Sequence, residues 1–209
     1  MKREVGVTAT QYYAFHMRYR PGHFNLISRG HALFQQLLVD AFAKIEADRL
    51  CYLRQHQATL RTETLRGLTD AINAGDVQGA AAGRIVLPAS FTGGTRYMIA
   101  KLNDALSYVR EFGGGDLFIT VTCNPFWPEI TTTLQRLYPG QRSSDHPEIV
   151  SQVFRQKLRG LLHLLQDGAV FGQVRAYISS IEWQKRGLPH AHIILWLAPE
   201  DKPRPDTID

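Results

Sequence analysis

The sequence predicts an α+β domain with a largely antiparallel sheet, helices on one face of that sheet, and a helical layer that precedes it. Helical periodicity dominates the first half of the chain, whereas short runs rich in branched and aromatic residues come later, around 117–122, 174–182 and 190–197. Helices and strands that come in separate runs, rather than alternating regularly along the chain, are typical of α+β domains. We therefore expect a helical region over 1–82 and an α+β region over 83–209.

The helices of the first half are expected in chain order. Residues 1–27 carry aromatic and basic side chains without a clear period, so a strand or loop that packs on the next helix is expected there, with a nucleic-acid stacking patch as the alternative. Apolar residues at helical spacing predict a long amphipathic helix over 28–57 and a second helix over 60–74. The small residues of 76–82 indicate a connection, and a third helix is expected over 97–112.

The second half begins with the strand over 117–122, which ends before Pro125 because proline cannot donate to a strand ladder. A helix is expected over 126–137. Asp145 and Glu148 are spaced like an acidic capping box, and they predict a further helix that ends at Gly168. The runs over 174–182 and 190–197 then form a hairpin.

Alternation along these strands separates apolar from polar side chains. Leu117, Ile119, Val121 and Ala191 are expected to face the helices. The residues expected on the opposite face are polar, and that face is expected to stay open to a ligand. They are Thr120, Thr122, Ser180, Glu182, His190 and His192.

His190 and His192 project from the same face of a strand and can therefore share one metal ion. If the hairpin turns through 184–189, Glu182 lies opposite His190 and completes a site of two histidines and one carboxylate. Such ligands suit Mn²⁺, Zn²⁺ or a Mg²⁺ that keeps several waters. The alternative is that the histidines only pack, which is common for an isolated H-x-H sequence.

Three side chains near this site are candidates for contact with nucleic acid. Lys185 and Arg186 lie in the turn and are expected to contact phosphates, and Trp127 follows the neighbouring strand and could stack on a base. Thr120 and Thr122 join this set because they share the open face. The alternative is a solvated turn and a tryptophan that belongs to the core.

Bulk composition excludes several classes of protein. The net charge of +5 is a mild excess that favours anionic partners. Two cysteines, Cys51 and Cys123, cannot form a disulfide scaffold, so a reducing, intracellular compartment is expected. No apolar stretch is long enough to span a membrane, so we expect a soluble protein without a membrane partner. A G-x-S-x-G nucleophile sequence and a G-x-x-x-x-G-K-[ST] phosphate loop are both absent from the sequence.

Three segments carry a resemblance to a known family. Residues 182–192 (EWQKRGLPHAH) resemble the metal-binding motif of HUH endonucleases, which include rolling-circle replication initiators and their transposon relatives. The likeness is greatest to the Helitron transposase, in its N-terminal Helitron helicase-like domain. Residues 116–130 (DLFITVTCNPFWPEI) resemble the first rolling-circle motif, and residues 84–94 are similar to the connecting region. The segments occur in the family's order.

The resemblance implies an HUH or Rep-like fold for the second region, with Mg²⁺ or Mn²⁺ at Glu182, His190 and His192. It also implies metal-assisted nicking and strand transfer of single-stranded DNA in rolling-circle transposition, a nuclear location, and a downstream helicase domain in the full-length protein.

In that family a tyrosine beyond the H-x-H strand attacks the phosphate. No tyrosine follows His192, so we expect no catalytic nucleophile in this chain and a C-terminally incomplete domain. Enzymatic activity is therefore left open. A non-catalytic DNA-binding remnant of a decayed transposon is the alternative.

Overall fold

The structure is a computed structural model that describes residues 6–60, 85–167, 170–184 and 187–203. The chain forms two compact units, of which one comprises Met1–Arg18 with Leu38–Asp104 and the other comprises Tyr19–Leu37 with Ala105–Asp209. The expected helix over 60–74 lies outside the described residues except for residue 60. The expected boundary at residue 82 also lies outside them.

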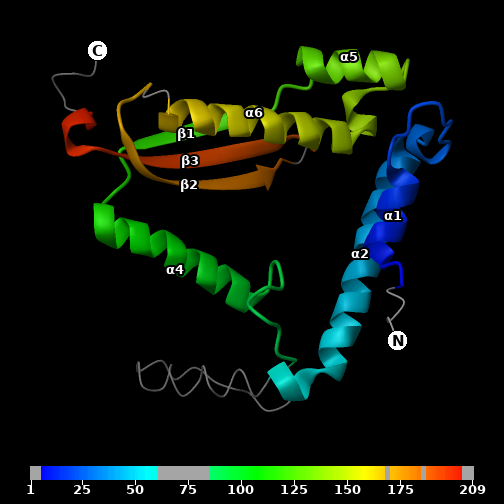
Figure 1. The fold of residues 1–209 in the computed structure, drawn as a ribbon, viewed down its shortest axis with the longest axis horizontal. Coiled ribbons are helices and arrows are strands. Elements are labelled where there is room, and N and C mark those ends of the chain that lie inside the picture. Colours follow the sequence, from blue (N-terminus) through cyan, green and yellow to red (C-terminus); the bar gives the residue numbers. More distant parts are fainter. Residues whose placement is uncertain (1–5, 61–84, 168–169, 185–186, 204–209) are drawn as a thin grey trace, which may run out of the picture. The chain divides into compact units, whose positions relative to one another are not determined.

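The second unit contains an antiparallel sheet of three strands in the order β1-β3-β2 (Figure 1). The strands are β1 (Leu117–Thr122), β2 (Val174–Trp183) and β3 (Pro189–Leu197). β3 lies in the centre, since it pairs with β2 on one side through the hairpin and with β1 on the other. The predicted α+β class and the predicted strands are confirmed.

One face of the sheet is covered by α6 (Pro147–Asp167), which runs along the strands in Figure 1. The apolar spacing of α6 places one stripe of side chains in the core, as helical periodicity requires. The core also takes residues from α5 (Pro128–Leu137) and from β3. Its buried members are Cys123, Ile130, Leu134, Tyr138, Val150, Phe154, Leu158, Leu165, Ala191, Ile193 and Leu195.

The opposite face is not wholly free of helices. Alternation places Trp196 on the same side of β3 as His190 and His192. Its ring stacks on Tyr108 of α4 (Thr95–Phe112), with 6.0 Å between ring centroids, and its Nε1 donates to the Gly113 carbonyl at 2.9 Å. The expectation of helices on one face alone is therefore incomplete, because the end of α4 contacts the other face at its Trp196 end.

The N-terminal segment contains a helix where a strand or loop was expected. α1 spans Ala9–Met17 and buries none of its residues, which is why it has no apolar period in the sequence. Local hydrogen bonds start it instead: the Gln11 amide donates to Thr8 Oγ1 at 3.2 Å, and the Thr8 amide donates to Gln11 Oε1 at 2.9 Å. Such a reciprocal pair satisfies two donors at a helix start.

The long predicted helix is α2, which spans Ala32–Gln55 and follows the 3₁₀ turn η1 (Ile27–Arg29). Two further 3₁₀ turns are η2 (Ser143–Asp145) and η3 (Pro199–Asp201). No helix in the described part of the chain is long and apolar enough to cross a membrane.

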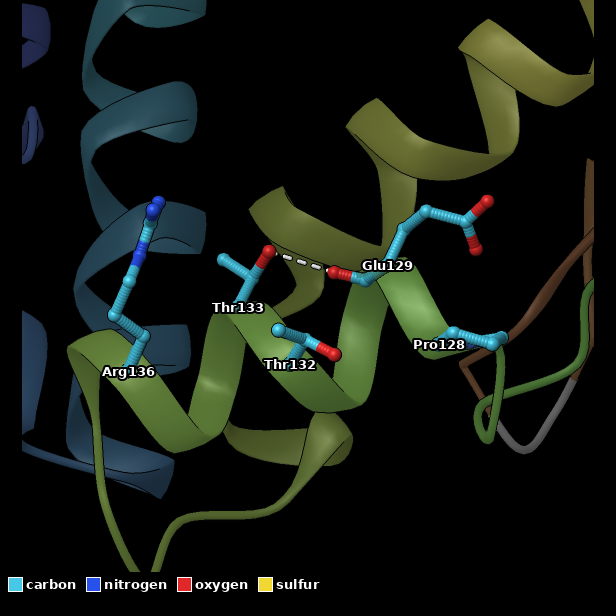
Figure 2. Close-up of a pocket in the computed structure, with 5 residues that line it drawn as sticks. All are labelled: Pro128, Glu129, Thr132, Thr133 and Arg136. Atoms are coloured by element: carbon cyan, nitrogen blue, oxygen red, sulfur yellow. Dashed lines mark hydrogen bonds between the residues drawn. The ribbon is translucent and has the colours of Figure 1, made fainter.

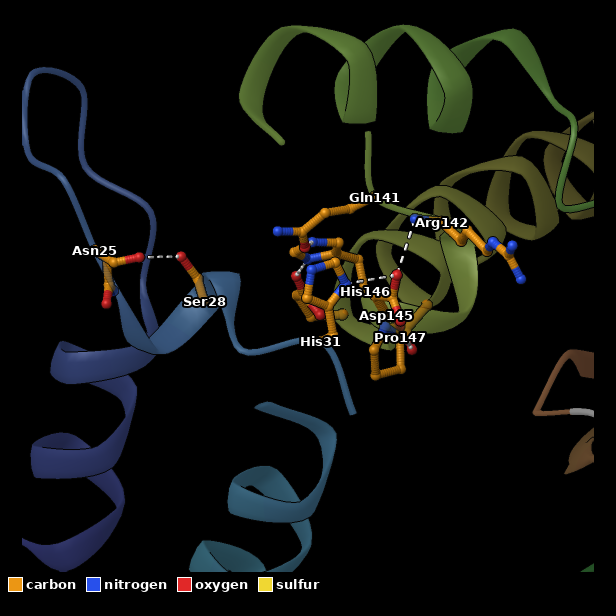
Figure 3. Close-up of polar contacts among 10 residues, drawn as sticks. Asn25, Ser28, His31, Gln141, Arg142, Asp145, His146 and Pro147 are labelled. Atoms are coloured by element: carbon orange, nitrogen blue, oxygen red, sulfur yellow. Dashed lines mark hydrogen bonds and ion pairs between the residues drawn. The ribbon is translucent and has the colours of Figure 1, made fainter. Parts of the chain in front are cut away.

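The connection between α5 and α6 is held by polar contacts (Figure 3). The carboxylate of Asp145 accepts from the Arg142 amide at 3.0 Å and lies 3.1 Å from Nδ1 of His31. Asp145 therefore caps η2, and α6 begins at Pro147. The predicted capping box of Asp145 and Glu148 at the start of α6 is wrong. The adjacent His146 is fully buried, with Nδ1 2.8 Å from Glu148 and Nε2 2.7 Å from Gln141.

Ile193 of β3 is fully buried in the core that β3 forms with α6. Ile193→Ala should lower the free energy of unfolding by about 2–5 kcal/mol, because it removes apolar contacts and leaves a cavity. The control is Leu164→Ala, at a position on α6 that is 53% exposed, which should change stability by no more than about 0.5 kcal/mol. Urea unfolding measures both, and equal losses would contradict this core.

A pH prediction follows from Asp145. The hydrogen bond from the Arg142 amide, and secondly the contact with His31, hold the pKa of the Asp145 carboxyl below its usual range. Its ionised form therefore stabilises the native state at neutral pH, and this contribution is lost as the pH falls through the folded-state pKa. Asp145→Asn should be less stable than wild type at pH 7, and the two should converge as the pH falls towards 3. A gap of constant size in urea unfolding would contradict this.

Candidate functional site

His190 lies at the centre of the polar face, between a side chain from each neighbouring strand. It pairs with Glu182 of β2 and with Thr122 of β1, so the predicted position of Glu182 opposite His190 is confirmed. Nδ1 of His190 is 3.4 Å from the Thr122 hydroxyl. Nε2 of His190 is buried and has no hydrogen-bond partner among the residues that the structure describes. A buried polar atom without a partner is costly, by about 1–3 kcal/mol, and it is free to act as a ligand.

His192 is held from several directions on the same face. Its Nδ1 is 3.3 Å from the Thr120 hydroxyl, and its Nε2 is 2.9 Å from Oε1 of Glu182. The ring of Phe118 lies nearly parallel to the imidazole, at 13°, with 5.5 Å between centroids. The imidazole is thus fixed in orientation, while its side chain and that of Glu182 remain 30% and 62% exposed.

The two histidines share one arrangement that suits metal binding. In both, a threonine hydroxyl faces Nδ1, which leaves Nε2 as the ring nitrogen for a metal, buried in His190 and partly exposed in His192. Histidines that bind metals usually donate the proton of the other ring nitrogen to an oxygen atom in this way. The 2.9 Å between His192 Nε2 and Glu182 Oε1 matches the separation of about 3 Å between neighbouring ligands around an octahedral ion.

The ligand set is not closed, however. Within the described residues, no three histidine, cysteine, aspartate or glutamate side chains converge closely enough to hold a metal ion. The contact that exists is the pair between His192 and Glu182, and His190 lies beside it. A shared ion would therefore require a side-chain movement, for which the exposed carboxylate of Glu182 is best placed.

The residues predicted to contact DNA differ in their surroundings. Thr120 and Thr122 lie on the open face, and their hydroxyls contact the histidines. Trp127 is partly buried, stacks on Phe154 with 6.5 Å between centroids, and packs against the core. Lys185 and Arg186 lie outside the described residues. Base stacking by Trp127 and phosphate contacts by the two basic residues therefore stay predictions.

Phe118 also lies on this face, although it was not among the residues predicted to bind metal or DNA. It is 66% exposed although it is a large apolar side chain. The signal was present in the sequence, because Phe118 shares the alternation of Thr120 and Thr122 and so occupies an outward position.

The tyrosine of β2 and the tyrosine that follows α5 do not lie on the polar face. Tyr177 pairs with Leu195 and packs against the core, so its side chain lies on the face opposite to Glu182. Tyr138 is 5% exposed and stacks on His146, with 4.0 Å between ring centroids. Neither hydroxyl is placed to attack a phosphate on the open face.

A separate hollow lies on α5 (Figure 2). Its lining comes from that one helix, and it includes none of the strand residues described above. The lining residues are Pro128, Glu129, Thr132, Thr133 and Arg136. Glu129 is paired with Lys157 at 2.7 Å, and the Thr133 hydroxyl donates to the Glu129 carbonyl, so these groups have partners within the protein.

The fold and the site together define a class: an α+β domain whose antiparallel sheet packs α6 on one face and carries, on the other, an H-x-H strand flanked by a carboxylate. The profile of the family described as the Helitron helicase-like domain at the N-terminus matches residues 12–195. The chain therefore belongs to this family, as the resemblance of its motifs predicted. No curated protein matches the chain.

Proposed function

We propose that the open face of the sheet binds single-stranded DNA and a divalent metal, Mg²⁺ or Mn²⁺, and takes part in HUH-type DNA nicking during rolling-circle transposition. The observation that carries this proposal is the unpartnered Nε2 of His190 beside the His192–Glu182 pair. Membership of the Helitron family supports DNA as the substrate. The polar, exposed character of the face supports access by an extended strand.

In this proposal Nε2 of His190, Nε2 of His192 and the Glu182 carboxylate hold the ion. When bound, a divalent ion supplies Lewis-acid polarisation of the scissile phosphate. In this role the hydroxyls of Thr120 and Thr122 accept from Nδ1 of the two imidazoles, which presents Nε2 to the ion. The exposed side of the site leaves room for a phosphate oxygen.

The attacking hydroxyl is assigned to no tyrosine of β2 or of the segment after β1, because Tyr177 and Tyr138 face the core. We infer that this chain supplies the metal-binding and strand-binding part of the reaction. A tyrosine helix and a helicase domain of the full-length family protein are the partners that the family implies, and the nucleus is the implied location.

The metal prediction uses isothermal titration of Mn²⁺ into the purified protein. His190→Ala and His192→Ala should each weaken Mn²⁺ binding at least about tenfold, because each removes one ligand. Thr122→Val keeps the shape of the side chain but removes the hydroxyl that faces His190, and it should weaken binding by about 10- to 100-fold.

The control for this titration is His163→Ala. His163 lies on α6 and forms an exposed pair with Asp167, so it offers a histidine and a carboxylate away from the sheet. This variant should bind Mn²⁺ as wild type does. Identical heats in wild type, His190→Ala and His192→Ala would refute the site.

A second functional prediction concerns covalent chemistry. Covalent catalysis needs an activated nucleophile within reach of the phosphate, and Tyr177, the last tyrosine of the sequence, faces the core. The 209-residue protein, incubated with labelled single-stranded DNA and Mn²⁺, should give no protein–DNA adduct that survives denaturation. A stable adduct would contradict this account, and peptide mapping would identify the tyrosine responsible.

A further inference from the structure

Phe118 is the one exposed large apolar side chain on the histidine face of the three strands, among the residues that the structure describes. Its strand neighbour on this face is Thr120, and its ring lies against His192. The ring is nevertheless 66% exposed, so the contact with His192 leaves most of its surface in water.

The surroundings of Phe118 indicate what kind of ligand would cover it. An apolar protein partner needs a continuous apolar surface. Ile194, which pairs with Phe118, and Ile178 beyond it are only partly exposed, and the other exposed residues of this face are polar. They are Thr120, Thr122, Ser180 and Glu182. A lone aromatic ring beside hydroxyls and imidazoles suits a ligand that combines a π-face with polar groups at short distance. A nucleotide has both.

We propose that Phe118 is a base-stacking residue, and that its exposed ring stacks on the nucleobase of the nucleotide whose phosphate lies at His192. This inference rests on the proposed function, because it assumes that single-stranded DNA crosses this face. Aromatic rings bind the bases of single strands in this manner without reading their sequence. The parallel stack of Phe118 and His192 also holds the imidazole, which couples the position of the base to the orientation of a metal-binding residue.

The test compares two labelled oligonucleotides of equal length and charge by fluorescence anisotropy. One carries bases, and the other is abasic throughout, so only the first offers a stacking partner. Phe118→Leu keeps an apolar side chain but removes the aromatic face. It should weaken binding of the base-containing strand by about 5- to 150-fold and leave binding of the abasic strand unchanged.

Two variants accompany it. Phe118→Trp should bind the base-containing strand at least as tightly as wild type, because the aromatic face is kept. Ile181→Ala is the matched control, since Ile181 is 51% exposed on the same sheet but alternates to the opposite face. It should bind both strands as wild type does.

The outcomes separate this inference from the proposed function. If wild type binds single strands and the binding weakens with added salt, but Phe118→Leu binds the base-containing strand equally well, the stacking assignment is overturned and the proposed function stands. An equal loss on both strands also overturns the assignment, because the loss then does not depend on a base. Failure of wild type to bind any single strand overturns the proposed function itself.

Discussion

Pairing on both sides of β3 fixes where every functional side chain of the sheet lies. Ala191 and Ile193 are fully buried against α6, and the intervening His190 and His192 therefore point to the opposite face. A slip of one residue in the strand pairing would place both imidazoles in the apolar core. Such a register is strongly disfavoured, because burying polar groups without hydrogen-bond partners costs free energy. The packing of α6 against one face of the sheet thus determines which side chains lie on the other face.

The two histidines of the polar face differ in their hydrogen bonds, and packing alone does not explain the difference. Among the residues that the structure describes, His192 contacts oxygen atoms at both ring nitrogens, whereas His190 contacts one at Nδ1 only. A protein that needed these histidines only for packing would gain stability from an apolar residue at position 190. A cost retained at one ring nitrogen, beside an exposed carboxylate, is typical of a site that completes its ligands on binding.

Sequence patterns predicted the sheet and its two faces well, because alternation and long-range burial leave the same signal in every strand. They failed where local contacts decide. The start of α1 depends on Thr8 and Gln11 rather than on a buried stripe. Asp145 caps a 3₁₀ turn that spacing alone could not distinguish from a helix start. Trp127 stacks on Phe154, a tertiary contact that no local pattern encodes, and its contact with DNA stays a prediction.

The central claim is that the open face of β3 binds one divalent ion between its two histidines and Glu182. Anomalous diffraction from a crystal of the protein soaked in Mn²⁺ tests it most directly. The account predicts a single strong peak about 2.2 Å from Nε2 of His190 and of His192, with the Glu182 carboxylate turned towards it. A crystal with no peak there, and with His192 still paired to Glu182, would contradict it.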